Sequence, residues 1–340
     1  MVNKIKVFVQ KYFLVGIGLL ALGLVPVFLQ SKYILNILTM FFIWGVVATS
    51  WDLILGYANV FSFGHLGFML VGGYTSGLLA IFLDISPWLG MIAGGLMATI
   101  ASLLIGIPCL RLEGLYLAIA TFAFQLVLPT FVVWAGPGRF EYFSTGGSYG
   151  LQPIPSPTIF GYEFSQFDPI PWYYLLLFIF FLFQIIIYLI IKSPVGLAFI
   201  ALRDSEVRAK TLGVDEYKYK LLVFAISGFI AGVMGGVYAH YLGLVSPVIV
   251  SLDTMLLVIV MVMFGGIGDY PGAALGALII TILNEVLRAT LTWRLVILGS
   301  IVVLVMILFP DGLMGIPKVI KSLSKRVGRL SSTNKEAVRD

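Results

Sequence analysis

The chain has 340 residues, of which 60% are hydrophobic and 11% are charged, and its formal net charge is +5 at pH 7. The mean hydropathy of +1.06 excludes a soluble domain, which would need a solvated polar surface. The single Cys109 and the two histidines exclude a disulfide framework and a metal site built from cysteine or histidine clusters. The composition predicts a polytopic membrane protein.

Apolar runs of helical length indicate that the membrane domain is all-α. A helix crosses the hydrocarbon core with about 20 apolar residues. About ten transmembrane segments are expected, at 13–29, 34–55, 66–83, 88–107, 114–134, 172–191, 220–242, 252–268, 271–288 and 295–309. The first run resembles a secretory signal, but "VPVFLQSKY" after it has no small-residue cleavage site. We therefore expect an uncleaved first helix.

The distribution of Lys and Arg predicts the orientation, because cytoplasmic loops retain basic residues. With the N-terminus inside, 17 of the 21 basic residues lie inside, and the exceptions are Lys32, Arg139, Arg288 and Arg294. We expect a cytoplasmic N-terminus at 1–12, a transmembrane domain at 13–310 and a basic cytoplasmic tail at 311–340. The basic balance is explained by these loops and by anionic lipid, without a nucleic-acid partner.

Two Gly-rich segments interrupt the predicted helices, "GYANVFSFGHLGFMLVGGYTSG" at 56–77 and "FGGIGDYPGAALG" at 264–276. Irregular backbone at membrane depth is tolerated only where protein or a water-filled cavity covers it. The two breaks therefore predict a translocation path, with candidate residues Ser62, Gly64, His65, Gly265 and Gly266. Close helix packing is an equal alternative for the glycines, and a structural hydrogen bond is the alternative for His65.

Glycines also recur at every fourth residue. Gly228, Gly232 and Gly236 form one stripe, and Gly268, Gly272 and Gly276 form another. Small residues at this spacing let two helix backbones approach closely in lipid. The first stripe predicts tight packing within this chain, and the second serves either this chain or a neighbouring subunit.

Two polar segments lie between the predicted spans. The loop at 136–171 is rich in Pro, Gly and aromatic residues and is expected outside. The charged segment at 192–219 is expected inside, and 195–212 has the composition of one helix of about 25 Å that stops at Gly213. Such a helix could be a lever gripped by a soluble partner, although a solvated loop is the plain alternative. Its candidate contact residues are Arg203, Asp204, Glu206, Arg208, Ala209, Lys210 and Gly213.

Motifs for covalent chemistry are absent from the sequence. There is no G-x-x-x-x-G-K-[ST], H-E-x-x-H, G-x-S-x-G or G-x-G-x-x-G pattern, so the chain is expected to be neither an ATPase nor another enzyme. The main acidic residues in the spans are Asp52 and Glu285, both near predicted helix ends, whereas proton-coupled carriers place such groups deep in the bundle. An ion-coupled carrier and a passive channel remain open at this point.

Several runs resemble the LivM-type permease subunits of branched-chain amino acid ABC transporters. These are "GLYLAIATFAF" (114–124), "TGGSYGL" (145–151), "GLAFIALRDSEVRAKTLGV" (196–214), "YKLLVFAISGFIAGVMGGVYAHYLGLVSP" (219–247) and "VMFGGIGDYPGAALGA" (262–277). A further run, "LILGYANVFSFGHLGFMLVGGYTSGLLA" (53–80), is similar but less close. The matching runs cover most of 53–285 in order.

The resemblance implies a permease subunit in the bacterial inner membrane and an importer of several subunits. Its partners would be a second, LivH-type permease, two cytoplasmic ATPases that bind ATP, and an extracytoplasmic substrate-binding protein; this chain itself would hold no cofactor. The charged segment would contain the coupling helix that docks onto an ATPase. Importer permeases carry Glu-Ala-Ala followed four residues later by Gly; Ala209 and Gly213 fit this spacing, while Val207 and Arg208 do not. Leucine, isoleucine and valine would be the substrates, with urea or short amides as the alternative.

Overall fold

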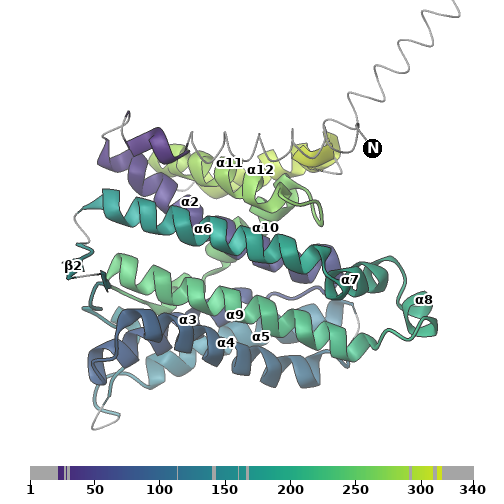
Figure 1. Cartoon of the computed structure of the whole chain (residues 1–340), viewed down its shortest axis with the longest axis horizontal. Helices are drawn as coiled ribbons and strands as arrows, with labels where there is room; N and C mark the ends of the chain where they lie inside the picture. Colours follow the sequence, from purple (N-terminus) through teal and green to yellow (C-terminus); the bar gives the residue numbers. More distant parts are fainter. Residues whose placement is uncertain are drawn as a thin grey trace, which may run out of the picture.

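The computed structural model describes residues 22–315, apart from 27, 29–30, 113, 140–142, 160, 166–167, 291–292 and 309–311. Its long helices lie side by side along one axis (Figure 1). Six of them are long and apolar enough to cross a membrane, which confirms a polytopic all-α membrane protein. The expected first span at 13–29 lies mostly outside the described residues, as do the terminus 1–12 and nearly all of the tail 311–340.

The six long helices are α2 (Lys32–Asp52), α3 (His65–Phe82), α4 (Pro87–Cys109), α5 (Leu115–Trp134), α6 (Pro169–Lys192) and α9 (Glu216–Leu242). Three shorter helices follow, α10 (Leu252–Gly265), α11 (Gly272–Val286) and α12 (Trp293–Leu308). The single-turn elements are η1 (Leu53–Tyr57), η2 (Gly147–Tyr149), η3 (Pro247–Ile249), η4 (Leu287–Thr290) and η5 (Leu313–Gly315). Each long or short helix overlaps one expected span. The count of about ten spans and the cytoplasmic placement of both termini stay predictions.

Helix starts follow local sequence signals. Proline occupies the first turn of α4 and α6, where its missing N–H costs no helical hydrogen bond. Asp168 accepts a hydrogen bond from the Ile170 N–H at the start of α6. Ser251 accepts one from the Thr254 N–H at the start of α10. These side chains pair backbone donors that the first helical turn leaves open.

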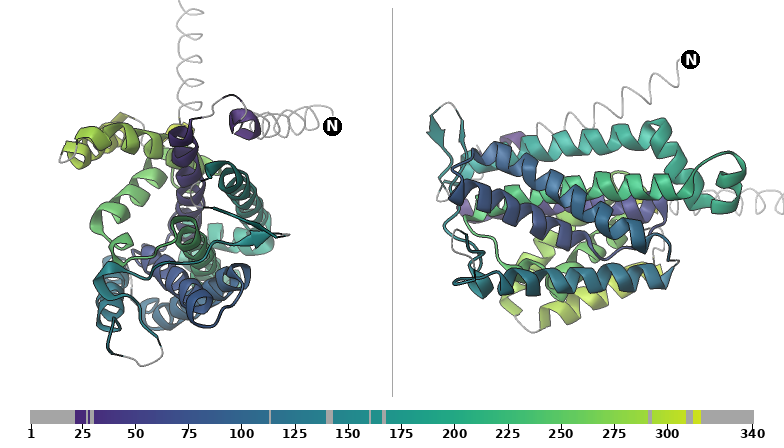
Figure 2. Two further views of the ribbon diagram at one scale, coloured as in Figure 1. Left: turned by 90° about the vertical axis from the view of Figure 1, so that its left-hand side faces the viewer. Right: turned by 90° about the horizontal axis from the view of Figure 1, so that it is seen from below.

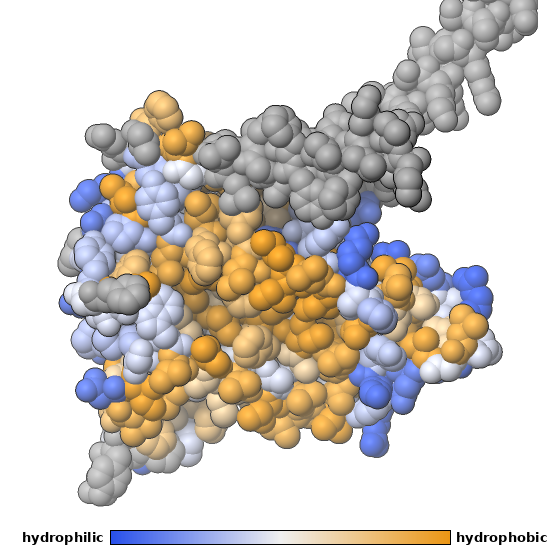
Figure 3. Space-filling view, in the orientation of Figure 1, coloured by the Kyte–Doolittle hydropathy of each residue, from blue (hydrophilic) through white to orange (hydrophobic). Residues whose placement is uncertain are grey.

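The helices differ in how far they are buried. In the most apolar window of each helix, 72% of the residues of α2 with η1 are buried, against 28% for α5. End-on, α2 stands near the middle of the bundle (Figure 2). Leu115, Ile119 and Val127 of α5 are exposed. The apolar side chains form a broad band between two polar ends (Figure 3), as expected for a surface covered by lipid.

Glycines bring α3, α4 and α9 into backbone contact. A methyl group at Gly72 of α3 would overlap the carbonyl oxygen of Gly232 in α9, and one at Gly94 of α4 would lie 2.5 Å from the Gly72 carbonyl oxygen. A larger residue at any of these positions would push the helices apart. The prediction that the stripe Gly228, Gly232 and Gly236 packs within this chain is confirmed.

The second stripe packs within the chain as well. A Cβ on Gly265 of α10 would overlap the carbonyl oxygen of Gly272, and one on Gly276 would overlap that of Met261. Helices α10 and α11 therefore form a tight hairpin around the turn 266–271. This contact accounts for Gly272 and Gly276 without a neighbouring subunit.

The two polar ends of the bundle carry different structures. At one end, which we call the loop end, residues 135–168 connect α5 to α6 and include the antiparallel pair β1 (Thr158–Ile159) and β2 (Tyr162–Glu163), with Thr158 opposite Glu163. Leu151 of this loop pairs with Val245, just after α9. The opposite end, which we call the charged end, carries α7 (Pro194–Asp204) and α8 (Glu206–Thr211) (Figure 1). The loop and the charged segment thus face opposite sides of the apolar band.

We expect the loop end to face outward. In a Cys109→Ser background, a cysteine at Ser148 of the exposed loop should react with an impermeant thiol reagent added to intact cells. A cysteine at Thr211 of α8 should react only after the membrane is opened. Both positions are exposed, so accessibility of the side chain itself is matched. The reverse labelling pattern would contradict the orientation predicted from the basic residues.

Candidate functional sites

The charged segment is two helices rather than one. Ser205 has extended backbone (φ −170°, ψ 109°) between α7 and α8, and its Oγ accepts a hydrogen bond from the Arg208 N–H at 3.4 Å. Serine side chains compete for backbone donors in this way and favour a helix start over a helix interior. The expectation of one continuous helix over 195–212 is therefore wrong. Composition indicated helix on both sides of Ser205, and the cap decides the break.

Helix α8 ends as expected but buries one predicted contact residue. Gly213 follows it with φ +84°, a left-handed conformation that glycine adopts without strain. Ala209 is only 1% exposed, because it packs against the chain itself. Val207 and Leu212 are 74% and 81% exposed. The outward apolar surface here is thus formed by Val207 of α8 and by Leu212 directly after it, neither of which was a predicted contact residue.

Ion pairs attach α8 to the first turns of α9. Lys220 Nζ lies 2.7 Å from Glu206 Oε1 and also pairs with Glu216. Lys210 Nζ lies 2.5 Å from Glu216 Oε2. The Lys220 side chain is 12% exposed, so this network is better shielded from solvent than a surface pair. A displacement of α8 would therefore act on the first turns of α9.

Arg203 of α7 joins the charged segment to the first break. Its Nη1 donates a hydrogen bond to the carbonyl oxygen of Gly56 at 3.0 Å. Gly56 lies in η1, a π-helical turn, whose wider hydrogen-bond spacing often marks a functional site. Asp204 pairs with Arg203 at 3.4 Å on the exposed side. Arg208 Nη2 donates to the carbonyl oxygen of Asp204 at 3.5 Å.

The two Gly-rich breaks lie against each other at the same junction. The Gly268 N–H donates a hydrogen bond to Asp52 Oδ1 at 2.9 Å, and the Tyr270 N–H donates to the Tyr57 hydroxyl at 3.1 Å. A Cβ on Gly268 would lie 2.5 Å from the Gly56 carbonyl oxygen. Residues far apart in sequence thus converge here, and the sequence analysis treated Asp52 only as a residue near a helix end.

Ser62, Gly64 and His65 are buried where α2, α3 and α9 meet. His65 Nε2 lies 2.8 Å from Ser50 Oγ, and His65 Nδ1 lies 3.4 Å from Ser227 Oγ. The Ser62 carbonyl oxygen accepts a hydrogen bond from Trp51 Nε1 at 2.7 Å. The void beside His65 measures about 10 Å³, so it has no room for a solute. The centre is closed in this conformation, and His65 makes the structural hydrogen bonds considered above.

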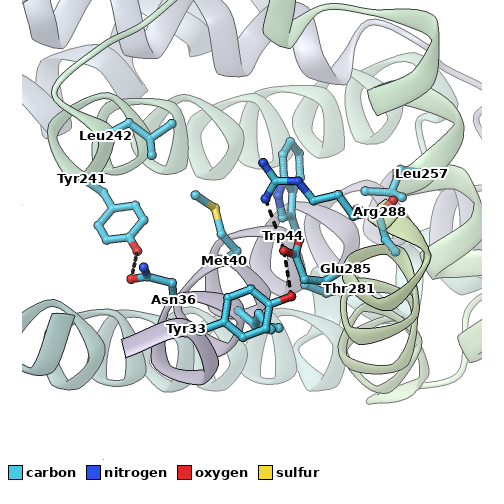
Figure 4. Close-up of a pocket in the computed structure, with 12 residues that line it drawn as sticks. Tyr33, Asn36, Met40, Trp44, Tyr241, Leu242, Leu257, Thr281, Glu285 and Arg288 are labelled. Carbon is cyan, nitrogen blue, oxygen red and sulfur yellow. Dashed lines mark hydrogen bonds and ion pairs between the residues drawn. The ribbon is translucent and has the colours of Figure 1, made fainter. Parts of the chain in front are cut away.

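A larger pocket of about 320 Å³ lies at the loop end, between α2, the end of α9, α10 and α11 with η4 (Figure 4). The Tyr33 hydroxyl and Arg288 Nη1 both donate to Glu285 Oε1, at 3.1 and 3.2 Å. The Tyr241 hydroxyl donates to Asn36 Oδ1 at 3.1 Å. Figure 4 shows the group around Glu285 and the pair of Tyr241 and Asn36 on either side of Met40.

The sequence analysis missed this pocket, although a signal was present. Thr281, Asn284, Glu285 and Arg288 are spaced by three and four residues, so they share one helix face. A polar face on an apolar span indicates contact with protein or a cavity rather than with lipid. The partner face from α2 could not be matched to it from sequence, because the pocket residues of α2 and α11 are far apart along the chain.

Comparison with known proteins gives one family for the chain. The model of the family described as branched-chain amino acid transport system / permease component matches residues 33–309. The high-affinity branched-chain amino acid transport system permease protein LivM of Escherichia coli K12 is 31% identical, over 90% of this chain and 75% of its own length. LivM of Salmonella typhimurium LT2 is 30% identical over the same shares. The corresponding LivH protein of Salmonella typhimurium is 24% identical, over 86% of this chain and 97% of its own length.

No solved structure matches the chain. Apart from Lys32, the matched residues 33–309 include every helix from α2 to α12, the charged segment and both breaks. These proteins are permeases rather than enzymes, and they are proteins of the inner membrane. The chain belongs to the family of permease components of branched-chain amino acid transport systems.

Proposed function

We propose that the chain is one membrane-spanning permease subunit of an ATP-driven importer of leucine, isoleucine and valine. The observation that carries this proposal is the family match over 33–309, supported by relatives that are named as branched-chain amino acid permeases. The relatives do not favour urea, short amides or an ion-coupled carrier. A second, LivH-type permease, two cytoplasmic ATPases and an extracytoplasmic binding protein complete the proposed importer. ATP is bound by the ATPases.

The segment 192–219 is proposed to be the coupling element. Its exposed apolar residues, Val207 and Leu212, offer a surface that an ATPase could cover. Around them lie the charges of Arg208 and Lys210, which would steer a partner into register. Ala209 does not contact the partner directly but packs α8 against the rest of the chain. Gly213 ends the helix.

Two connections could carry movement of α8 into the membrane. The first is the set of ion pairs that Glu206 and Lys210 make with the first turns of α9. The second is the hydrogen bond from Arg203 to the carbonyl oxygen of Gly56 in the π-helical turn. The Gly56 turn contacts the loop that joins α10 to α11. ATPase closure would thus shift the α10–α11 hairpin relative to α2, α3 and α9.

We place the closed part of the route at Ser62, Gly64 and His65. Three observations support this position: the irregular backbone of 59–64, the polar groups of Ser50 and Ser227 beside His65, and the adjacent coupling junction. Gly265 and Gly266 contribute to the route indirectly, because they hold together the α10–α11 hairpin. When the hairpin moves, the space beside His65 could widen into a passage for a neutral zwitterion.

Reconstitution tests the proposed function. The complete complex with its binding protein should take up leucine, isoleucine and valine when ATP is supplied. Uptake of lysine and glutamate should be at least about tenfold lower, because a charged side chain finds few counter-ions in the spans. ATP-driven uptake of lysine with no uptake of leucine would contradict the substrate class. Failure of the chain to copurify with ATPases would contradict the ABC assignment.

A further inference from the structure

The pocket at the loop end contains polar groups that the described residues leave without a hydrogen-bond partner. Thr281 Oγ1 and Asn284 Oδ1 are buried and have no hydrogen-bond partner among the described residues. Thr281 is 7% exposed. A buried oxygen without a hydrogen-bond partner destabilises the fold, so such atoms call for a ligand or water. Both residues line the pocket beside Glu285.

Thr281, Asn284 and Glu285 present hydrogen-bond acceptors to the pocket. The Glu285 carboxylate, Asn284 Oδ1 and Thr281 Oγ1 can all accept hydrogen bonds, and they lie on one face of α11. A primary ammonium group has three donors and no acceptor. This face therefore suits an ammonium group, with Glu285 as its counter-ion.

Arg288 supplies the opposite charge at the rim. Its side chain is 73% exposed, against 20% for Glu285, so it is free to turn toward a carboxylate while the Glu285 carboxylate stays in place. A guanidinium binds a carboxylate through two parallel hydrogen bonds. Because the pair is neutral overall, the pocket favours a ligand whose own charges cancel and disfavours a net cation or anion.

The deeper wall is apolar. Tyr33 and Asn36 lie in the first turns of α2, whereas Met40 and Trp44 lie one to three turns further into the bundle on the same face. Leu257 lines the pocket from α10. The volume of about 320 Å³ is at the lower end of the range of roughly 300–1,000 Å³ for small-molecule sites. The pocket thus offers a charged mouth and an apolar floor to a small amphipathic solute.

The pocket is at the end of the bundle that carries the long loop. Leu242, which lines it, is three residues before Val245, and Val245 pairs with Leu151 of that loop. The charged end with α8 lies at the other side of the apolar band (Figure 1). In the proposed orientation the pocket faces the side on which the substrate is delivered.

We infer that this pocket is a loading site for zwitterionic aliphatic amino acids. Glu285, Asn284 and Thr281 hold the ammonium group, Arg288 holds the carboxylate, and Met40, Trp44 and Leu257 receive the aliphatic side chain. The inference rests on the proposed function and adds a binding site to it. A zwitterionic lipid headgroup has the same pairing of ammonium and anion, so the experiment separates these two sources.

Binding is measured on the complete complex without its binding protein. The complex is placed in nanodiscs of phosphatidylglycerol and phosphatidylcholine, and labelled leucine is titrated at equilibrium. Wild type should bind leucine at least about tenfold more tightly than leucinamide, which lacks the carboxylate, or 4-methylpentanoate, which lacks the ammonium; one charge-assisted hydrogen bond accounts for such a factor.

Two variants test the carboxylate contact and the ammonium contact separately. Arg288→Gln should weaken leucine about tenfold and leave leucinamide unchanged, because only leucine has the carboxylate. Glu285→Gln should weaken leucine and leucinamide and leave 4-methylpentanoate unchanged. Glu163→Gln, on the exposed strand β2 at the same end, makes the same chemical change outside the pocket and should bind as wild type. Since Arg288 is exposed, its variant should fold even where Glu285→Gln does not.

Several outcomes would overturn the inference. These are no leucine binding by wild type, an Arg288→Gln variant that weakens leucine and leucinamide equally, or unchanged leucine binding in both variants. Glycerophosphoethanolamine competing better than leucine would show a lipid-headgroup site and would overturn it as well. ATP-driven leucine uptake by the wild-type complex with its binding protein is measured separately. Uptake with no binding in the pocket leaves the proposed function standing and removes the loading site.

Discussion

Replacing Leu212 with Asp should cut ATP-driven uptake at least about tenfold, the effect of losing one interface anchor of about 1.4 kcal/mol or more. Leu212 is 81% exposed, so the permease itself loses almost no packing. The charged side chain would instead be buried unpaired wherever an ATPase covers α8. The measurements are uptake, the amount of ATPase that copurifies and the amount of permease in the membrane. Only the first two should fall.

Ala209→Asp is the matched comparison, since it introduces the same side chain three residues earlier, within α8. Ala209 is 1% exposed, so the carboxylate would enter the packing between α8 and the rest of the chain. This variant should lower the amount of folded permease as well as uptake. Normal uptake and normal ATPase assembly with Leu212→Asp would mean that α8 is a solvated loop without a coupling role.

Gly265→Ala should lower the yield of folded permease, because the added methyl group would overlap the carbonyl oxygen of Gly272 in the neighbouring helix. Overpacking of this kind costs about 1–3 kcal/mol, more than the gain of at most about 1 kcal/mol in helix propensity. Uptake per assembled complex should change little. Thermal unfolding of the purified complex and quantitative immunodetection in membranes measure the effect.

Gly299→Ala provides the control within α12. Among the described residues, no atom outside the local backbone of α12 lies within 4 Å of a Cβ at that position, so the same substitution should leave yield and stability at the level of wild type or slightly above it. A Gly265→Ala complex that assembles in normal amounts but transports poorly would contradict the packing role and would show that Gly265 lines the route.

Sequence patterns located the helices well, because the signal for a membrane span is a property of about 20 consecutive residues. The expected segment at 88–107 corresponds to Pro87–Cys109, and that at 172–191 to Pro169–Lys192. The glycine stripe of α9 was also predictable, since spacing alone places Gly228, Gly232 and Gly236 on one face. The break between α7 and α8 at Ser205 was not predictable, because one N-cap side chain ends the helix although the residues on both sides favour helix.

The candidate sites were predictable only in part. Both breaks were found from Gly, Pro and polar residues, but their mutual contact depends on Asp52 and Gly268, which 216 positions separate. The burial of Ala209 and the exposure of Leu212 depend on which face of α8 meets α9, and a six-residue helix is too short to show a face by periodicity. Tertiary packing decides these features.

The hydrogen bond from Arg203 to Gly56 ends on a backbone carbonyl rather than on a side chain. A carbonyl oxygen has no rotamers of its own, so its position follows the helix backbone. The guanidinium of Arg203 is therefore coupled to the backbone of the α2–η1 segment. Rotamer changes of individual side chains in that segment do not alter this contact. Substitutions around this junction should be tolerated as long as the wide turn and its glycine keep the oxygen facing α7.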